Sequence, residues 1–365
     1  MRWTVGLDSV PLKLAAFLGS WALGYASFRL IERPIRQSRW IARLSSQAVI
    51  VGGLAAVGLV VTGIAGSIAI RPHLALTVTR DRNVWSMIYQ STGAGGCTAH
   101  GSRQDGAQVF VPPACGAQPI GRTLFIIGDS HAMGYQRLSG NLARLDGIAV
   151  RNFGETGCPV LPRPDATAPS AHCVGFVAQS LDAVERQARS GDWLFLPGLR
   201  MPRYREAWGE YLEARVPSKP YGDADLREFV ARMRPLLDRG VAVILEVPKP
   251  IYTTAPMRCA DWFNRTNAYC REASPTAADI KARAAVVTAA WVRLRVMEPR
   301  LRVWDAFPLL CPDPVCEPFV LGQPVTYDGD HLTAWAQDRL TPAFRGYLLA
   351  PAHPDKTVTA PEYPH

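Results

Sequence analysis

The chain has 365 residues, of which 48% are hydrophobic and 19% are charged. A chain of this composition can bury enough apolar surface to fold, so disorder over most of its length is excluded. The net charge of +9 is concentrated near the N-terminus, because residues 1–47 carry seven basic and two acidic groups while residues 121–365 are nearly neutral. A nucleic-acid binder concentrates Lys and Arg on its folded part, so nucleic acid is disfavoured as a partner.

Residues 48–70 form an apolar run without one charged side chain. At ~1.5 Å per residue, a helix of this length crosses the ~30 Å hydrocarbon layer of a membrane. A buried core helix is the alternative, and a cleaved signal peptide is disfavoured because the run is too long and starts too late. A second, weaker candidate runs from Leu12 to Phe28 and is interrupted by Lys13 and Ser20. The sequence therefore predicts one or two transmembrane helices.

Five arginines lie between the two apolar segments. Basic flanks of this kind stay on the cytoplasmic side of a membrane. Residues 29–47 should therefore face the cytoplasm, and the chain after residue 71 should lie on the other side. Residues 71–120 contain Pro and Gly, and we expect an irregular linker there. The arginines are Arg29, Arg33, Arg36, Arg39 and Arg43.

All eight cysteines follow the apolar run. An even number of cysteines confined to the exterior fits disulfides formed in an oxidising compartment. A zinc site is the alternative, but the chain has no CxxC pair and no histidine pair at ligand spacing. The sequence leaves the connectivity open, and pairing each cysteine with its neighbour is the simplest arrangement. The cysteines are Cys97, Cys115, Cys158, Cys173, Cys259, Cys270, Cys311 and Cys316.

Between residues 121 and 350, short apolar runs alternate with helical patterns. This alternation predicts an α/β fold with a parallel sheet covered on both faces, and in such sheets sites form at the carboxyl ends of the strands. A Pro-rich tail occupies residues 351–365. The expected strands are Thr123–Ile127, Ile148–Asn152, Trp193–Leu196, Ala242–Glu246 and Leu301–Trp304, and the expected helices are 131–145, 174–190, 224–239, 276–297 and 333–348.

The first of these strands runs into Gly128-Asp129-Ser130-His131. A serine on such a turn projects above the edge of the sheet, and its own N–H lies at the start of a helix, where negative charge is favoured. Asp129-Ser130 is also compatible with an ordinary helix N-cap. The motif therefore makes Ser130 a candidate nucleophile, although Gly-Asp-Ser alone is weak evidence.

A second motif, Thr326-Tyr-Asp-Gly-Asp-His-Leu-Thr, precedes the last expected helix. Asp328 and His331 stand three residues apart, so one turn can place the carboxylate against the ring Nδ1. The Nε2 atom is then free to take the Ser130 proton, as a Ser-His-Asp catalyst requires. Asp330 is adjacent to His331, and we expect its side chain to point away from the ring. A surface turn capped by an aspartate is the alternative interpretation.

Together, Gly128-Asp129-Ser130 and the later Asp-x-x-His resemble the SGNH hydrolase family. The stretch Phe28-Arg-Leu-Ile-Glu-Arg-Pro-Ile-Arg is similar to the close of an acyltransferase-3 membrane domain, which some bacterial O-acyltransferases fuse to an SGNH domain. The resemblance implies an SGNH-type three-layer sandwich. It divides the chain into a membrane-domain remnant with a basic cytoplasmic loop (1–47), a transmembrane helix (48–70), a periplasmic extension (71–120), the SGNH domain (121–350) and a tail (351–365).

The resemblance also assigns roles to individual residues. Ser130 matches the nucleophile, His331 the general base and Asp328 its orienting partner. The backbone N–H groups of Ser130 and Gly157 match the oxyanion hole, the set of donors that stabilises the tetrahedral intermediate. The family normally adds an asparagine after the third strand, where this chain has Pro197-Gly-Leu-Arg200, and Arg200 is a weak substitute. A triad of this kind needs no cofactor and no metal.

Three functions remain open. The leading hypothesis is transfer of an acyl group, acetyl by the resemblance, to an envelope glycan such as lipopolysaccharide O-antigen. The same triad with water as acceptor makes a carbohydrate acetyl-esterase, and a third hypothesis is a non-catalytic, membrane-anchored glycan-binding domain. Aromatic side chains that could line an acceptor groove, although aromatics more often belong to the core, are Tyr204, Trp208, Tyr211 and Trp262.

The resemblance places the protein in the bacterial inner membrane, with its catalytic domain in the periplasm. Membrane lipid and an acyltransferase-3 membrane domain, which supplies the acyl group, are the expected partners. This chain retains only what looks like the last helix of that roughly ten-helix domain, so we expect either a fragment or a partner polypeptide. Asp8 and Lys13 do not rebuild the missing catalytic site.

Overall fold

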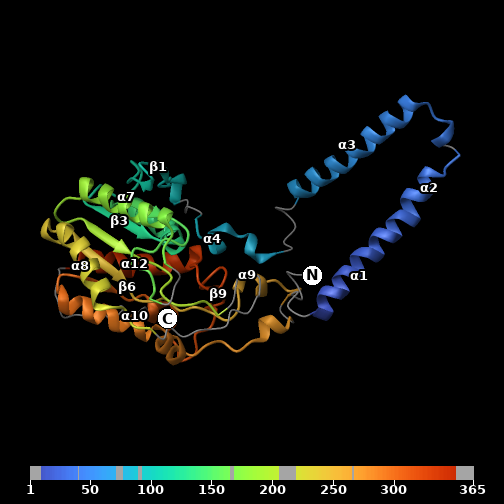
Figure 1. Ribbon diagram of the computed structural model, residues 1–365. Helices are drawn as coiled ribbons and strands as arrows, with labels where there is room; N and C mark the ends of the chain where they lie inside the picture. The colour runs from blue at the N-terminus through green and yellow to red at the C-terminus, as the bar shows by residue number, and fades with distance from the viewer. Residues whose placement is uncertain are drawn as a thin grey trace.

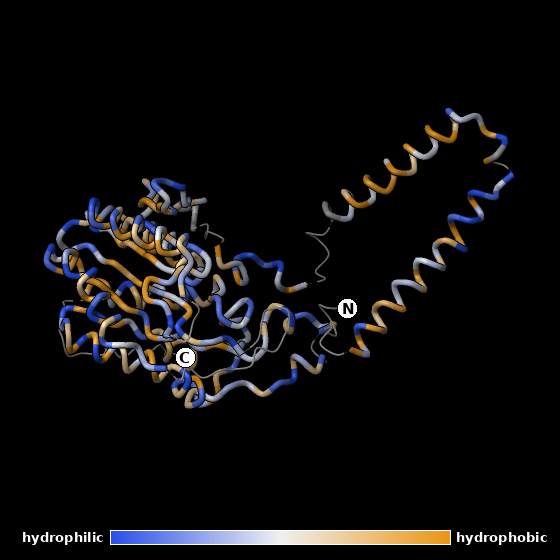
Figure 2. The backbone as a smooth tube through the Cα atoms, viewed as in Figure 1, coloured by the Kyte–Doolittle hydropathy of each residue, from blue (hydrophilic) through white to orange (hydrophobic). Residues whose placement is uncertain are grey.

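Two apolar helices open the computed structural model, which describes residues 10–39, 41–70, 77–88, 93–164, 168–204, 219–264 and 267–350. Helices α1 (Val10–Ser27) and α3 (Ser46–Ile70) extend away from the rest of the molecule (Figure 1). Both are long and apolar enough to cross a membrane. Hydrophobic residues predominate along them (Figure 2), and their side chains are exposed, which fits a lipid environment rather than a protein core.

The short elements of the N-terminal half connect these helices to each other and to the remainder of the chain. None of them is longer than five residues. They are η1 (Phe28–Glu32), α2 (Arg33–Arg36), η2 (Ile41–Arg43), η3 (Val78–Arg80), α4 (Arg82–Trp85) and η4 (Ala94–Gly96).

A seven-stranded sheet with the order β1-β2-β4-β3-β5-β6-β7 forms the centre of the α/β domain. Strands β3 to β7 pair in parallel, whereas β1 and β2 add an antiparallel edge beside β4. The strands are β1 (Ser102–Gln104), β2 (Ala107–Phe110), β3 (Thr123–Gly128), β4 (Ala149–Gly154), β5 (Trp193–Leu196), β6 (Ala242–Glu246) and β7 (Arg302–Trp304), and a separate hairpin joins β8 (Phe319–Val320) to β9 (Gln323–Pro324).

Helices cover both faces of this sheet, as the alternating side chains of β3 demonstrate. Leu124 and Ile126 pack into a core with α6 (Gln136–Asp146) and α12 (Ala334–Leu349). Phe125 and Ile127 pack on the opposite face with α7 (Ala171–Gln187), α8 (Asp223–Asp238) and α10 (Ala277–Met297). The remaining helices are α5 (Ser130–Met133), α9 (Pro256–Cys259), η5 (Ala268–Arg271) and α11 (Phe307–Leu310). The three-layer α/β fold predicted from the sequence is confirmed.

Two local expectations differ from the structure. Residues 102–110, expected to be irregular, form the hairpin β1–β2 through a two-residue turn at Asp105 and Gly106, both with positive φ. The helix expected over 131–145 begins at Ser130 and is interrupted at Gly134 and Tyr135, which separate α5 from α6. Ser130 lies at the edge of the sheet because α5 begins two residues after the last residue of β3.

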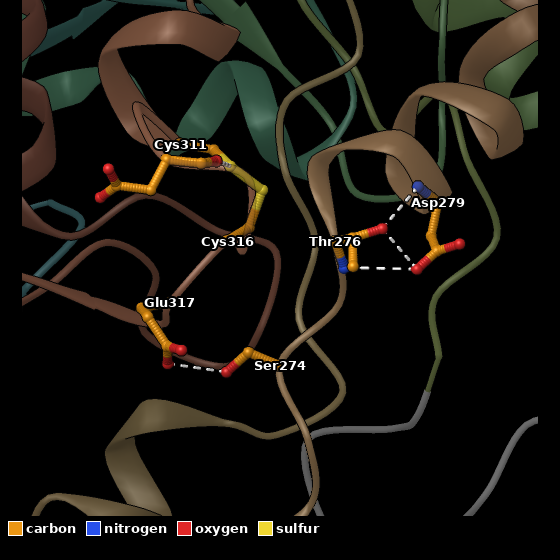
Figure 3. The surroundings of a disulfide bond; sticks show 7 residues. Ser274, Thr276, Asp279, Cys311, Cys316 and Glu317 are labelled. Carbon is orange, nitrogen blue, oxygen red and sulfur yellow. Dashed lines mark hydrogen bonds between the residues drawn. A yellow bond between two sulfur atoms is a disulfide. The ribbon is translucent and has the colours of Figure 1, made fainter.

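Each cysteine pairs with its neighbour in sequence, so all eight are in disulfides as expected. Figure 3 shows the Cys311–Cys316 disulfide beside the start of α10. There Ser274 Oγ donates to a Glu317 oxygen over 2.8 Å, and the Thr276 hydroxyl caps α10. The Cys316 N–H also donates to the Pro275 carbonyl over 2.9 Å, so the disulfide loop is held against the segment that begins α10.

Candidate active site

Ser130 begins α5 and is separated from the end of β3 at Gly128 by Asp129 alone. Its turn fits tightly against the loop after β5, because a Cβ on Gly128 would lie 2.4 Å from the Pro197 carbonyl oxygen. Asp129 fixes the same contact: its Oδ1 accepts from the His131 N–H and its Oδ2 from the Leu199 N–H, each over 2.9 Å. The serine therefore stands on a turn held from both sides.

The Asp129 carboxylate remains ionised in this buried position. Burial opposes its ionisation, but electrostatic interactions with His131 and Arg200 and hydrogen bonds from the two backbone N–H groups outweigh that effect and lower its pKa. An anionic cap suits the two N–H donors it holds.

His331 lies against Ser130 from the other end of the chain. Its Nε2 is 2.8 Å from Ser130 Oγ, and its Nδ1 is 2.8 Å from Asp328 Oδ2. The other Asp328 oxygen accepts from the His331 N–H over 3.0 Å. The turn is closed by the Tyr327 N–H, which donates to the His331 carbonyl over 2.8 Å. The sequence-predicted Ser130, Asp328 and His331 are thus brought together in hydrogen-bonding order.

The expectation that Asp330 points away from His331 is wrong. Gly329 adopts φ 110°, a backbone conformation open to glycine, and this turn brings the next carboxylate back under the imidazole. Asp330 Oδ1 lies 3.4 Å from His331 Nδ1, and the side chain is only 3% exposed. Its Oδ2 lies 3.2 Å from His131 Nε2 and accepts from Arg203 Nε over 2.6 Å.

Two carboxylates beside one imidazole raise the proton affinity of His331. Burial alone would lower its pKa, but Asp328 and Asp330 outweigh burial and raise the pKa to about 10. Hydrogen bonds with His131 and His331 hold the pKa of Asp330 well below its usual range despite its burial. His331 therefore rests in the protonated state around neutral pH and must lose this proton before it can accept one from Ser130.

His131 is the second imidazole of this cluster. Its ring stacks on His331, with centroids 4.6 Å apart, and burial lowers its pKa. A neutral His131 avoids placing two positive rings face to face. Its Nδ1 atom is buried and has no hydrogen-bond partner among the described residues.

Gly157 and Arg200, the two residues expected to complete the oxyanion hole beside the Ser130 N–H, lie in different environments. Gly128 pairs with Gly154 across β3 and β4, so the following loops, which carry Ser130 and Gly157, leave the same edge of the sheet. Gly157 is exposed in a turn with φ 75°, and its role stays a prediction.

Arg200 is buried and turned elsewhere. Its Nη1 donates to the Leu161 carbonyl over 2.8 Å and its Nη2 to the Leu196 carbonyl over 3.1 Å. The structure therefore uses this guanidinium to hold two backbone segments, which argues against the weak expectation that it donates to the oxyanion.

Of the aromatic candidates for an acceptor groove, Trp208 and Tyr211 lie outside the described residues. Tyr204 packs under the Arg283 guanidinium, 4.1 Å from its ring centre, and against the core. Trp262 is 71% exposed and meets the Phe263 ring edge-to-face. These two therefore line no common groove in the described part of the chain.

Among the described residues, the only cluster of three or more His, Cys, Asp or Glu side chains close enough together to be considered for a metal ion is His131, Asp330 and His331, whose nitrogen and oxygen atoms lie within 4.8 Å of one another. The Arg203 guanidinium already binds the same Asp330 oxygen as His131. A cation next to this oxygen disfavours a metal ion there. The cluster is better described as a charge network beside Ser130.

Sequence reasoning missed Asp330, His131 and Arg203 as members of this site. His131 and Asp330 each adjoin a predicted catalytic residue, so their positions in the two motifs were the available signal. Arg203 belongs to the loop after β5, from which only Arg200 was predicted as a site residue. Its contact with Asp330 spans 127 residues of sequence, and no local pattern reports it.

A family model described as "SGNH domain (fused to AT3 domains)" matches residues 96–346, more than half of the chain. Solved structures with a similar fold include the periplasmic domain of a Salmonella ser. Paratyphi A lipopolysaccharide acetyltransferase, at 14% identity and TM-score 0.42, covering 63% of this chain and 84% of that one. An acetyl-xylooligosaccharide esterase mutant from Geobacillus is similar at 15% identity and TM-score 0.34, covering 66% and 98%. The search of curated proteins found no match.

Proposed function

Because the chain belongs to the family of SGNH domains fused to AT3 domains, we propose that it transfers an acyl group, acetyl in the first instance, to hydroxyl groups of an envelope glycan such as lipopolysaccharide O-antigen. The observation that carries the proposal is the 2.8 Å approach of His331 Nε2 to Ser130 Oγ, with Asp328 at the opposite ring nitrogen. This order of groups is the one that nucleophilic acyl transfer requires.

In the first step, Ser130 Oγ attacks the acyl carbonyl carbon while neutral His331 takes the hydroxyl proton at Nε2. Asp328 holds the ring and stabilises the imidazolium that forms. The tetrahedral intermediate collapses when the bond to the leaving oxygen breaks and His331 protonates that oxygen. The product is an acyl ester on Ser130.

In the second step, a sugar hydroxyl attacks the ester carbonyl and gives its proton to His331. Collapse of this intermediate breaks the bond to Ser130 Oγ, which recovers the proton, and leaves the acyl group on the glycan. The Ser130 and Gly157 N–H groups are our candidates for stabilising both oxyanions, each donor contributing about 3 to 4 kcal/mol.

The acyl donor would come through an AT3 membrane domain, the partner that the family description names for SGNH domains of this kind. Helices α1 and α3 supply membrane anchoring, and the arginines between them favour a cytoplasmic loop. We therefore place the α/β domain in the periplasm, next to the inner membrane. The four disulfides support an oxidising compartment.

The second candidate function is a carbohydrate acetyl-esterase, favoured by the same Ser130–His331 contact with water as the acceptor. A third, a glycan-binding domain without catalysis, is opposed by the hydrogen-bonded order of the three side chains.

The test uses the full chain in detergent with 4-nitrophenyl acetate as the acyl donor. Release of 4-nitrophenol by the wild type and its loss in Ser130→Ala, with Ser190→Ala as an exposed control, supports an acyl-enzyme route. Adding O-antigen polysaccharide then separates the two enzymes. Acetyl recovered on the glycan supports transfer, and acetate alone supports the esterase. Equal rates in wild type and Ser130→Ala would overturn both.

A further inference from the structure

The carboxylate of Asp330 lies between three nitrogen-bearing side chains, and nothing in the triad mechanism uses it. We propose that Asp330 is a second carboxylate partner of His331, shared with His131 and Arg203, and that this sharing decides whether His331 is neutral when Ser130 reacts. Asp330, His131 and Arg203 are positioning residues in this account, because they act through His331. The inference rests on the proposed acyl-transfer function for its consequence, but not for its geometry.

The position of Asp330 is fixed by its backbone. The Tyr252 N–H donates to the Gly329 carbonyl over 2.9 Å, and a Cβ on Gly329 would contact the Tyr252 and Thr254 carbonyl oxygens at 3.4 Å. Thr326 and Leu332 form a bridge across the base of the turn. The Asp330 side chain is only 3% exposed in this position, so its charge must be compensated by groups inside the site.

The Asp330 carboxylate stabilises the protonated form of His331 unless another cation competes for the same carboxylate. Asp330 Oδ1 lies 3.4 Å from His331 Nδ1, while Oδ2 receives Arg203 Nε over 2.6 Å and lies 3.2 Å from His131 Nε2. Arg203 gives the shorter contact and carries a permanent charge. Its guanidinium therefore draws Asp330 away from His331, whereas removing Arg203 would return the full carboxylate charge to the imidazole.

His131 contributes a neutral donor rather than a second charge. Nε2 faces the Asp330 carboxylate, so the proton lies on that atom, and Nδ1 is left buried without a partner among the described residues. The ring also covers one face of His331. His131 thus shares the carboxylate while excluding water from the base.

The charged and titratable groups around His331 come from four parts of the fold. Asp328 and Asp330 lie on its own turn, and Arg203 comes from the loop after β5. His131 and Asp129 come from the nucleophile turn, and Lys249 follows β6 and acts on His131. Only Asp330 among these contacts both imidazoles and the guanidinium, so it is the residue at which the balance can be changed.

Opposite substitutions should move the titration of His331 in opposite directions. In Asp330→Asn the imidazole loses one anion, and we expect its pKa to fall by about 1 to 3 units. In Arg203→Gln the carboxylate loses its competing cation, and we expect the His331 pKa to rise by about half a unit or more. A residue that merely supported the fold would move stability and leave both titrations in place.

The experiment follows the His331 ring signals of the full chain in detergent by NMR while pH is varied, with His331→Gln identifying the resonance. The acid limb of kcat/KM for 4-nitrophenyl acetate is measured in parallel. Matched controls are Asp192→Asn, buried at 4% at the opposite end of β5, and the exposed Arg232→Gln. Both controls should keep the wild-type titration.

Shifts of opposite sign in the two variants would support charge sharing. Unchanged titration in Arg203→Gln, which is 29% exposed and therefore tolerates substitution, would overturn it even if Asp330→Asn fails to fold. The NMR titration needs no turnover. If Ser130→Ala matched the wild type in activity, the acyl-transfer proposal alone would fail, and the titration would still decide the charge sharing.

Discussion

At the scale of single residues, the site depends on how one aspartate and one histidine are oriented. Asp328 accepts hydrogen bonds from both the ring Nδ1–H and the backbone N–H of His331. It therefore holds the ring in the orientation that presents Nε2 to Ser130. Asp330 lacks the backbone contact. This difference favours Asp328 over Asp330 for the orienting role that we propose, although both carboxylates lie near the ring.

Asp328→Asn should keep the fold but present the wrong hydrogen-bonding pattern to His331. We expect kcat for 4-nitrophenyl acetate to fall by about 10⁴-fold, the size of effect known for this change in a Ser-His-Asp triad. Steady-state kinetics and a thermal melt of the full chain check this. A loss smaller than tenfold would mean that Asp328 does not orient the base.

The pH dependence follows from the raised pKa of His331. A base with a raised pKa is neutral only above that value, so activity should be lost as pH falls through it. We expect the acid limb of kcat/KM to lie well above ~6.5, the ordinary value for histidine. An acid limb at or below that value would show that the two carboxylates do not act together on the ring.

The three triad residues could be predicted from the sequence, whereas the contacts of Asp330 and Arg203 could not. Ser130, Asp328 and His331 stand in two short motifs, so their proximity was predictable. The contact of Asp330 with His331 depends on the φ of Gly329, and that of Arg203 with Asp330 depends on a loop 127 residues away. Backbone conformation and long-range packing of this kind leave no local pattern.

At the scale of elements, the buried strands were the most predictable part. β5 and β6 have the predicted bounds because β5 is a continuous apolar run buried on both faces and β6 is apolar up to its last residue, Glu246. The hairpin β1–β2 was missed because β1 is short and exposed. Its Asp105-Gly106 turn was nevertheless a usable signal, since this dipeptide suits a two-residue hairpin with two positive φ angles.

The core between the sheet and α6 and α12 should carry much of the stability. Ile126, fully buried in β3, points into it two residues before Gly128. We expect Ile126→Ala to lower the free energy of unfolding by about 2 to 5 kcal/mol. Val296→Ala, on an α10 side chain that is 79% exposed, is the control and should change it by less than about 0.5 kcal/mol. Denaturant unfolding measures both, and equal losses would contradict the packing described.

At the scale of the whole molecule, we propose that the loop between α1 and α3 and the α/β domain lie on opposite sides of a membrane. Because all eight native cysteines are in disulfides, an introduced cysteine gives a clean label. In spheroplasts, a membrane-impermeant maleimide should label Ser190→Cys in the α/β domain and leave Ser45→Cys unlabelled until the cells are lysed. The reverse pattern would invert the proposed topology.

We propose that Ser130 carries the acyl group between donor and glycan. The most direct measurement is mass spectrometry of peptides from the full chain, quenched in acid during its reaction with 4-nitrophenyl acetate. We predict an acetyl group on Ser130 of the wild type, a longer-lived one in His331→Gln if acylation still proceeds there, and none at this position in Ser130→Ala. Turnover by the wild type with no acetyl on Ser130, or with acetyl on a different side chain that is required for turnover, would contradict the account.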